Sequence, residues 1–151
     1  MNRTLVLLAL VAVGASWDGR PPGNIQQLFT AESWTSGHAP FPAGTYVITK
    51  LTSYTAWGDD QIKVNNALVQ SGVRFTTTAP WVITLDSRDL FVEPSTGPKF
   101  QWSDLGLGRD LHSWRFGAED MAHGDEDFND VIARVDECAL REAVYVCGNG
   151  K

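Results

Sequence analysis

Acidic side chains are concentrated in one stretch near the C-terminal end of the chain, from Glu119 to Asp130. Carboxylates this close together repel one another, so the stretch resists compaction unless a cation neutralises it. Ca²⁺ suits such a stretch because it takes about six to eight oxygen ligands in flexible geometry. The alternative is a solvated acidic loop that binds no ion. The candidate calcium ligands are Asp125, Asp127, Asp130, Asn129, Glu119 and Asp120.

The spacing of these residues is similar to the start of an EF-hand loop, in which alternate side chains bind the ion. Asp125, Asp127 and Asn129 alternate in this way. An EF-hand requires glycine at the sixth position, however, and here that position is Asp130. The residues that follow, from Val131 to Val135, are rich in β-branched side chains and predict a strand. The pattern therefore predicts a calcium loop that leads into a strand and not into a helix.

A longer motif surrounds the acids. It reads F-G-A-E-D from Phe116 to Asp120 and G-D-E-D-F-N-D-V from Gly124 to Val131. This motif resembles the hallmark of the bacterial domain of unknown function 4114, a family found in exported, often calcium-dependent proteins that include cell-surface adhesins. Relatives carry a glycine-rich run where this chain has Met121-Ala122-His123. The resemblance covers about twenty residues and implies a β-sandwich with calcium held at the motif.

The size and charge of the chain are those of a globular domain without a nucleic-acid-binding surface. The chain has 151 residues, of which 43% are hydrophobic, and this is enough for a sizeable core. The formal net charge is -6, and the eight acids between Glu119 and Glu137 exceed that figure. The rest of the chain is therefore close to neutral and has no basic patch, which argues against nucleic-acid binding.

The N-terminal residues are typical of a signal peptide. Arg3 supplies a positive charge, an apolar run extends from Leu5 to Val13, and small residues precede a cleavage position after Ala15. The run is too short to span a membrane. It would also serve as a buried first strand, and both alternatives stay open. With export, residues 1–15 are a signal peptide, 16–24 a linker and 25–151 a calcium-binding domain, secreted or held at the cell surface.

The chain has two cysteines, Cys138 and Cys147. A disulfide between them would stabilise the fold by about 2.5–3 kcal/mol in the loop-entropy account. An exported protein favours that bond, and the alternative is two free thiols. A zinc site is not expected, because no third and fourth ligand lie at metal-binding spacing.

Short apolar or alternating segments separated by turn signals predict an all-β fold, an antiparallel β-sandwich or jelly roll in a single domain. Ile25 to Ala31 fits a strand or a short helical turn, and Ser103 to Asp110 predicts a glycine-containing turn. The expected strands are Thr45–Tyr54, Gln61–Val69, Val73–Thr78, Trp81–Leu85, Leu90–Val92, Phe100–Trp102, Leu111–Phe116, Val131–Val135 and Ala143–Val146.

Six tryptophans are many for a chain of this length. Trp81 and Trp114 lie in apolar strands, so we expect both in the core. Trp34 and Trp57 lie beside loops that contain glycine, serine and aspartate, which makes them candidates for stacking on a sugar ring. The alternative for both is an ordinary surface position without a ligand.

No catalytic residue and no enzymatic activity are predicted. Glycoside hydrolysis needs two acids facing each other across a cleft, whereas these acids crowd into one loop where a metal takes them. His38, His112 and His123 have no serine or cysteine nearby in a nucleophile context. A hydrolase is therefore the weakest of three hypotheses.

The leading hypothesis, implied by the resemblance, is an exported calcium-binding β-sandwich module for adhesion, extracellular matrix or glycan contact. Its alternative is a self-assembling structural subunit of a filament, sheath or virion, with calcium stabilising the fold or the subunit contacts. The expected partners are a glycan or cell-surface ligand, or further copies of the chain. No nucleic acid and no membrane span in the mature chain are expected.

Overall fold

The structure is a computed structural model that describes residues 23–39, 41–53, 61–86, 99–119 and 125–150. Within these residues no helix is long and apolar enough to cross a membrane. Several predictions concern residues outside these ranges: the signal peptide, Trp57, Asp120, His123 and the strand at 90–92.

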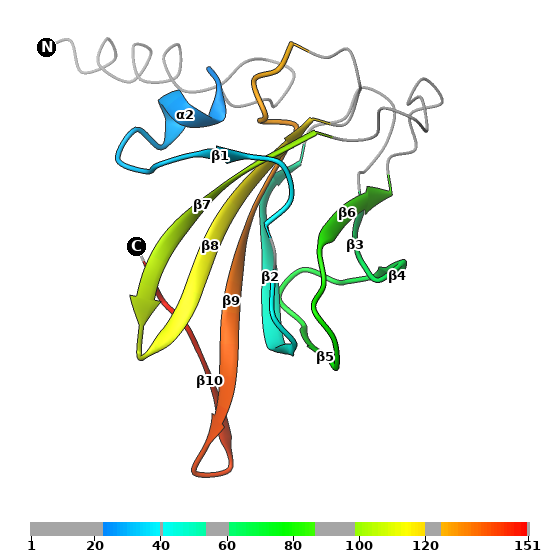
Figure 1. The fold of residues 1–151 in the computed structure, drawn as a ribbon, viewed down its shortest axis with the longest axis vertical. Helices are drawn as coiled ribbons and strands as arrows, with labels where there is room; N and C mark the ends of the chain where they lie inside the picture. Colours follow the sequence, from blue (N-terminus) through cyan, green and yellow to red (C-terminus); the bar gives the residue numbers. More distant parts are fainter. Residues whose placement is uncertain (1–22, 40, 54–60, 87–98, 120–124, 151) are drawn as a thin grey trace, which may run out of the picture.

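The described strands form two antiparallel sheets, which confirms the predicted all-β, sandwich-like fold (Figure 1). The large, seven-stranded sheet has the order β1-β7-β8-β9-β2-β5, and β10 also pairs with β9. Its strands are β1 (Thr35–Ser36), β2 (Gly44–Ser53), β5 (Arg74–Thr77), β7 (Lys99–Gly108), β8 (Leu111–Glu119), β9 (Val131–Arg141) and β10 (Val144–Cys147). The three-stranded sheet has the order β4-β3-β6, from β3 (Gln61–Val64), β4 (Ala67–Leu68) and β6 (Ile83–Asp86).

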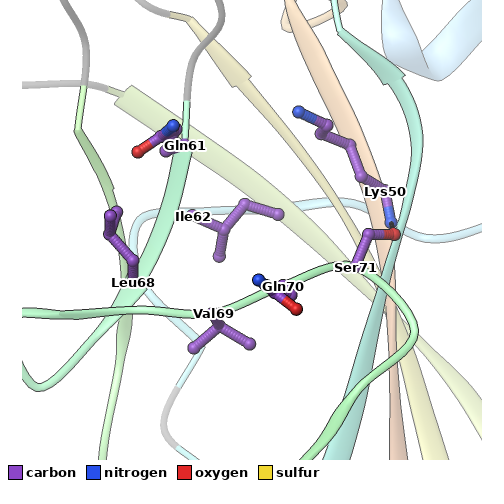
Figure 2. A pocket seen from close by; sticks show the side chains of 7 residues that line it. All are labelled: Lys50, Gln61, Ile62, Leu68, Val69, Gln70 and Ser71. Atoms are coloured by element: carbon purple, nitrogen blue, oxygen red, sulfur yellow. Dashed lines mark hydrogen bonds between the residues drawn. The ribbon is translucent and has the colours of Figure 1, made fainter.

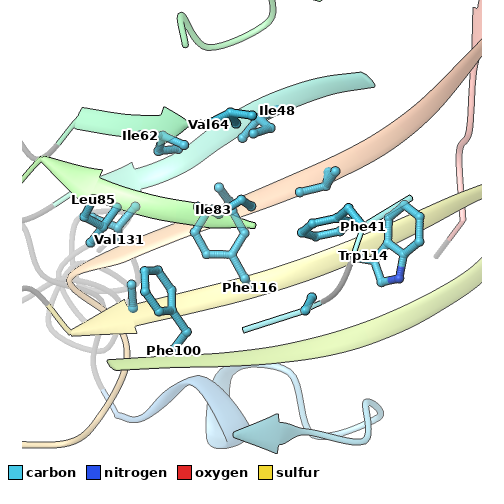
Figure 3. Close-up of a cluster of buried hydrophobic side chains, with 14 of the residues drawn as sticks. Phe41, Ile48, Ile62, Val64, Ile83, Leu85, Phe100, Trp114, Phe116 and Val131 are labelled. Atoms are coloured by element: carbon cyan, nitrogen blue, oxygen red, sulfur yellow. The ribbon is translucent and has the colours of Figure 1, made fainter. Parts of the chain in front are cut away.

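The hydrophobic core fills the space between the two sheets (Figure 3). Alternation along the strands directs every second side chain into it, since successive strand residues point to opposite faces. Trp81 and Trp114 are only 3% and 9% exposed, so both tryptophans predicted for the core lie there. Phe41 packs against both rings, with centroid distances of 4.3 Å to Trp81 and 5.0 Å to Trp114.

A single helical turn, α2 (Ile25–Leu28), covers part of the other face of the large sheet. Asn24 caps it, since its side chain accepts a hydrogen bond from the Gln27 backbone N–H at 2.8 Å. Ile25 is completely buried, and Gly117 of β8 leaves room for it: a Cβ at Gly117 would lie 3.0 Å from Ile25 Cγ1. Of the two structures that the sequence allowed for this segment, the protein forms the helical turn.

The segment around Gly106 differs from the prediction of a turn over Ser103–Asp110. Strand β7 continues through it to Gly108, and its pairing with β8 shifts register between Asp104 and Gly106. Gly106 has a φ of 81°, so the glycine accommodates a β-bulge instead of ending the strand. The chain turns at the end of the predicted segment, at Arg109 and Asp110, directly after Gly108.

Three other predicted strands have different bounds. Gln61–Val69 is split into β3 and β4 by Asn65 and Asn66, whose φ values of 50° and 64° suit a two-residue hairpin turn. Strand β8 extends to Glu119, so this acid ends a strand instead of beginning a loop. Strand β9 extends to Arg141, because pairing with β2 and β10 continues the ladder past Val135.

The predicted disulfide between Cys138 and Cys147 is present, and the alternative of two free thiols is wrong. The two residues face each other across β9 and β10, whose hairpin projects past the ends of β7 and β8 (Figure 1). The residues after β10 pack back on the sandwich, where the Gly150 N–H donates to Ser113 Oγ at 3.3 Å. The covalent link therefore closes the end of the sheet opposite the acidic loop.

Candidate metal centre

Three acids meet at the end of the sheet where β8 passes into β9. Glu119 is the last residue of β8, and Asp125 and Asp127 lie in the loop before β9. One carboxylate oxygen from each lies within 4.8 Å of the others. The pairing of β8 with β9, from Ser113↔Asp136 to Ala118↔Val131, brings the two ends of this loop together.

Glu119 is the buried member of the cluster, with none of its surface exposed. Its Oε1 accepts a hydrogen bond from the Phe128 backbone N–H at 2.5 Å. Its Oε2 is buried and has no hydrogen-bond donor among the residues that the structure describes. An ionised carboxylate in such a position costs free energy unless a cation or a proton accompanies it.

The acid–base behaviour of Glu119 reflects this environment. Its pKa is raised from 4.5 to about 7: burial is the largest cause, the Phe128 N–H acts in the opposite direction, and the nearby Asp130 and Asp127 add to the rise. None of these groups is a lysine or an arginine. The negative charges of the neighbouring acids therefore favour binding of a proton or a cation at Glu119.

Asn129 holds the carboxylate of Asp127 in place. Its Nδ2 donates to Asp127 Oδ2 at 2.7 Å and to the Gly23 carbonyl at 2.8 Å, and its backbone N–H donates to Asp127 Oδ1 at 3.2 Å. Asn129 was predicted as a calcium ligand through its amide oxygen; the structure places its amide nitrogen on Asp127, and the ligand role of the oxygen stays a prediction. Asp130 is 5% exposed and acts on Glu119 through its charge, but it is not one of the three clustered acids.

The backbone of the loop is shaped by two residues that alternate with the acids. Glu126 and Phe128 both have a φ of 57°, a conformation that non-glycine residues adopt rarely and that is concentrated at functional sites. The Phe128 carbonyl packs on Gly117, where a Cβ would lie only 2.3 Å from its oxygen. The glycine of the F-G-A-E-D motif therefore allows the loop to pack closely against β8.

No pattern in the sequence indicates that the segment before α2 belongs to this site. The Ile25 N–H donates to the Asp127 carbonyl at 2.8 Å, and Gly23 accepts from Asn129. These contacts join residues about a hundred positions apart in the chain, and no local pattern marks them. The loop therefore packs against Gly117 of β8 and is hydrogen-bonded to residues 23–25.

The donor set determines what the cluster can hold. Its three side chains offer only carboxylate oxygens, which suit hard cations and not soft metals that prefer sulfur or imidazole. Glu119 is buried, Asp127 is half-buried and Asp125 is exposed, so a cation can reach the buried oxygen from the solvent side. The buried acidic cluster could therefore hold a metal ion.

The remaining predicted site residues are placed elsewhere. Trp34 is half-buried, and its indole N–H donates to the Phe29 carbonyl at 3.4 Å, so its role in sugar stacking stays a prediction. Of the histidines weighed as catalytic groups, His112 Nε2 lies 2.7 Å from Asp104 Oδ1. The His38 ring lies 4.7 Å from the ring of Phe100.

The motif around the cluster remains a local resemblance over about twenty residues. The geometry of Glu119, Asp125 and Asp127 therefore carries the functional argument by itself. No protein-family model matches the chain, and no curated protein or solved structure matches it either.

Proposed function

We propose that this protein is an exported β-sandwich module that binds Ca²⁺ at Glu119, Asp125 and Asp127 and serves in adhesion, extracellular matrix or glycan contact. One observation carries the calcium proposal: Glu119 is fully buried, its Oε2 has no donor among the described residues, and other acids lie beside it. A divalent cation supplies what that arrangement needs.

Calcium fits better than the other divalent ions of similar hardness. Mg²⁺ demands near-octahedral geometry and keeps several waters, whereas Ca²⁺ accepts irregular oxygen sets with mixed protein and water ligands. The three acids come from a strand end and a loop, and Asp125 is exposed, so water completes the coordination. A nearby carboxylate, Asp130, adds negative charge that favours a divalent ion.

Two features support the proposal of an exported binding module. The Cys138–Cys147 disulfide suits an oxidising compartment, where such bonds persist. The motif resemblance points to exported, calcium-dependent adhesin-type proteins. The acids form one cluster that a cation would occupy, and this arrangement favours a structural or binding role over acid–base catalysis.

Calorimetric titration of chelator-stripped protein with calcium and with magnesium tests the site. We expect one calcium-binding transition in the titration and much weaker magnesium binding. Asp127→Asn should raise the Kd for calcium at least about tenfold, which is about 1.4 kcal/mol. Asp110→Asn is the matched control, since Asp110 is an exposed acid in a turn of positive φ that asparagine tolerates. Absence of calcium binding near millimolar concentration would refute the proposal.

A second function is favoured by the β9–β10 hairpin. Leu140, Val144 and Tyr145 on it are 61%, 64% and 38% exposed, and the hairpin projects from the sandwich (Figure 1). Exposed apolar side chains in a group favour contact with another protein surface. The rival proposal is therefore a self-assembling structural subunit of a filament, sheath or virion.

Size-exclusion chromatography and negative-stain microscopy in calcium and in chelator separate the two functions. A binding module stays monomeric, whereas an assembling subunit forms regular polymers that Leu140→Glu disperses. Leu107→Glu is the control, because Leu107 is 66% exposed but belongs to β7 and not to the hairpin.

A further inference from the structure

A groove of about 350 Å³ lies next to the acidic loop. This volume is within the range of about 300–1,000 Å³ that small-molecule sites occupy. One side is formed by the residues after β1 and by β7, and the other by the acidic loop. Its lining residues are Ser36, Gly37, His38, Phe100, Gln101, Glu126 and Phe128.

The groove and the acid cluster share one short segment of chain. Asp125 and Asp127 belong to the cluster, whereas the alternating residues Glu126 and Phe128 line the groove. The Phe128 N–H also donates to the buried Glu119 carboxylate. A cation that fixes the loop therefore also fixes one wall of the groove.

The opposite wall is held by the body of the protein. Gln101 lies on β7 and its Oε1 accepts from Gln26 Nε2 of α2 at 3.2 Å. Phe100 is 6% exposed, and the His38 ring lies against it at 4.7 Å. This wall is built on β7, whereas Glu126 and Phe128 form the wall that a cation on the loop would hold.

The lining chemistry selects a class of ligand. The hydroxyl of Ser36, the imidazole of His38, the amide of Gln101 and the carboxylate of Glu126 offer both donors and acceptors. A purely apolar ligand would cover these polar groups and shield them from water, which is costly. The ring of Phe128 adds an apolar surface, and aromatic rings pack against the C–H faces of other rings.

The charges of the lining residues also restrict which ligands the groove can bind. None of these lining residues, all within the described part of the chain, is a lysine or an arginine, so an anionic ligand finds no direct partner. A cationic ligand would meet Glu126 but would be repelled by the divalent ion on the same loop. A neutral ligand with several hydroxyl groups and an apolar face meets every one of these conditions.

We propose that this groove binds a neutral sugar ring and that binding requires the calcium-loaded loop. The inference rests on the proposed calcium site and deepens it, because it assigns the ligand class and makes calcium a condition for ligand binding. The coupling is reciprocal: a ligand that prefers the calcium-loaded loop also raises the affinity for calcium.

A second pocket, of about 380 Å³, provides an internal control (Figure 2). It is lined by Gln61, Ile62, Leu68, Val69, Gln70, Ser71 and Lys50, and none of these residues belongs to the acidic loop. Gln70 is an exposed glutamine there, which matches Gln101 in chemistry. Changes at Gln70 therefore report on effects unrelated to the groove.

The test is a titration of the ¹⁵N-labelled protein with methyl glycosides of glucose, galactose, mannose and N-acetylglucosamine, followed by NMR. In calcium, at least one glycoside should shift the amides of residues 36–38, Gln101 and Phe128, and chelator should abolish these shifts. Phe128→Ala and Gln101→Ala should each weaken the binding about tenfold or more, whereas Gln70→Ala should not change it. Methylammonium and acetate serve as the cationic and anionic comparison probes.

Several outcomes overturn the inference. They are the absence of shifts with every glycoside in calcium, equal shifts in chelator, a stronger response to methylammonium or acetate, and shifts confined to the second pocket. Calorimetric calcium titration of the same samples separates the two proposals. Normal calcium binding without glycoside binding overturns this inference alone, whereas absent calcium binding overturns the proposed function. Retained calcium binding in Gln101→Ala shows that the variant is folded.

Discussion

Two clusters of charged side chains lie on the same pair of strands, β8 and β9, and their charges are balanced in different ways. Near the middle of the strands, Arg115 pairs with Glu32, and Arg134 Nε lies 2.8 Å from Asp136 Oδ1. At the end of the strands, Glu119 meets two further acids. The first cluster contains its own counter-charges, whereas the second, within the described residues, is a group of acids that could hold a metal ion.

The paired cluster is closed by several independent contacts. Asp136 also accepts from Ser113 Oγ at 2.6 Å, and Arg134 Nη2 donates to the Gly150 carbonyl at 2.6 Å. The guanidinium of Arg115 lies 3.9 Å above the ring of Phe29. Half-buried charges are tolerated when they are paired, as they are here, although Glu32 Oε2 and Arg115 Nε have no hydrogen-bond partner among the described residues.

The two clusters differ in the groups that the fold places beside their charges. In both clusters the residues alternate along β8 toward the same face, from Ser113 and Arg115 to Gly117 and Glu119. Residues from the rest of the chain reach the first two positions. Beside Glu119 the described groups that act on its charge are two acids and one backbone N–H, so this end of the strands could hold a cation. Four experiments test whether the two clusters differ in this way.

The largest effect is expected from Arg115→Met, which removes one partner of the Arg115–Glu32 pair. The two side chains are 12% and 13% exposed, so Glu32 would be left as a nearly buried charge. We expect a loss of about 3 kcal/mol in the free energy of unfolding, equal in calcium and in chelator. Urea unfolding curves measure it, with Arg141→Met, an exposed arginine of β9, as the control. A loss confined to chelator would mean that the two clusters are not independent.

Calcium itself should have the next largest effect. A ligand that binds only the folded state stabilises it by about 2.7 kcal/mol at a hundredfold excess over Kd. The melting temperature should therefore rise by several degrees in millimolar calcium, and magnesium should substitute poorly. Differential scanning fluorimetry in calcium, magnesium and chelator measures this. Three identical curves would indicate a solvated acidic loop that binds no ion.

Glu119→Gln should produce opposite effects with and without calcium. In chelator at neutral pH the variant should be more stable than the wild type by about 1 kcal/mol, because it removes a buried charge while its side-chain oxygen can still accept from Phe128. In calcium it should be less stable, because it lacks the buried ligand. The variant should therefore have the higher melting temperature in chelator and the wild type the higher one in calcium. A variant that is less stable in both conditions would contradict the claim that the buried Glu119 carboxylate is unfavourable without a cation.

The smallest effect is a pH dependence in chelator. The pKa of Glu119 is about 7 in the folded protein, above its ordinary value of 4.5. The folded state therefore binds more protons than the unfolded state between these values, and stability falls as pH rises from about 4.5 to about 7. The Glu119→Gln variant should lack this part of the slope. Urea midpoints measured across this pH range give the difference, and parallel slopes would argue against the raised pKa.

The sequence by itself determines the fold class, the strand that follows the acidic loop and the position of the acids. Period-two patterning decides which residues face the core, as at Trp114 and Phe116, because burial of alternate residues is a local property of a strand. The disulfide could be predicted because only two cysteines are available and they flank one hairpin. The bulge at Gly106 was predicted as a turn, because a glycine signal alone does not distinguish the two.

The tertiary structure decided how the acids are used. Strand pairing brings Glu119 beside Asp125 and Asp127, and packing under the loop buries Glu119 completely. The sequence indicated six candidate ligands, and only the fold shows that Glu119, Asp125 and Asp127 form one cluster. The contacts from Gly23 and Ile25 and the groove at Gln101 depend on residues far apart in the chain. Local patterns contain no information on such contacts, because strand order and loop packing alone bring those residues together.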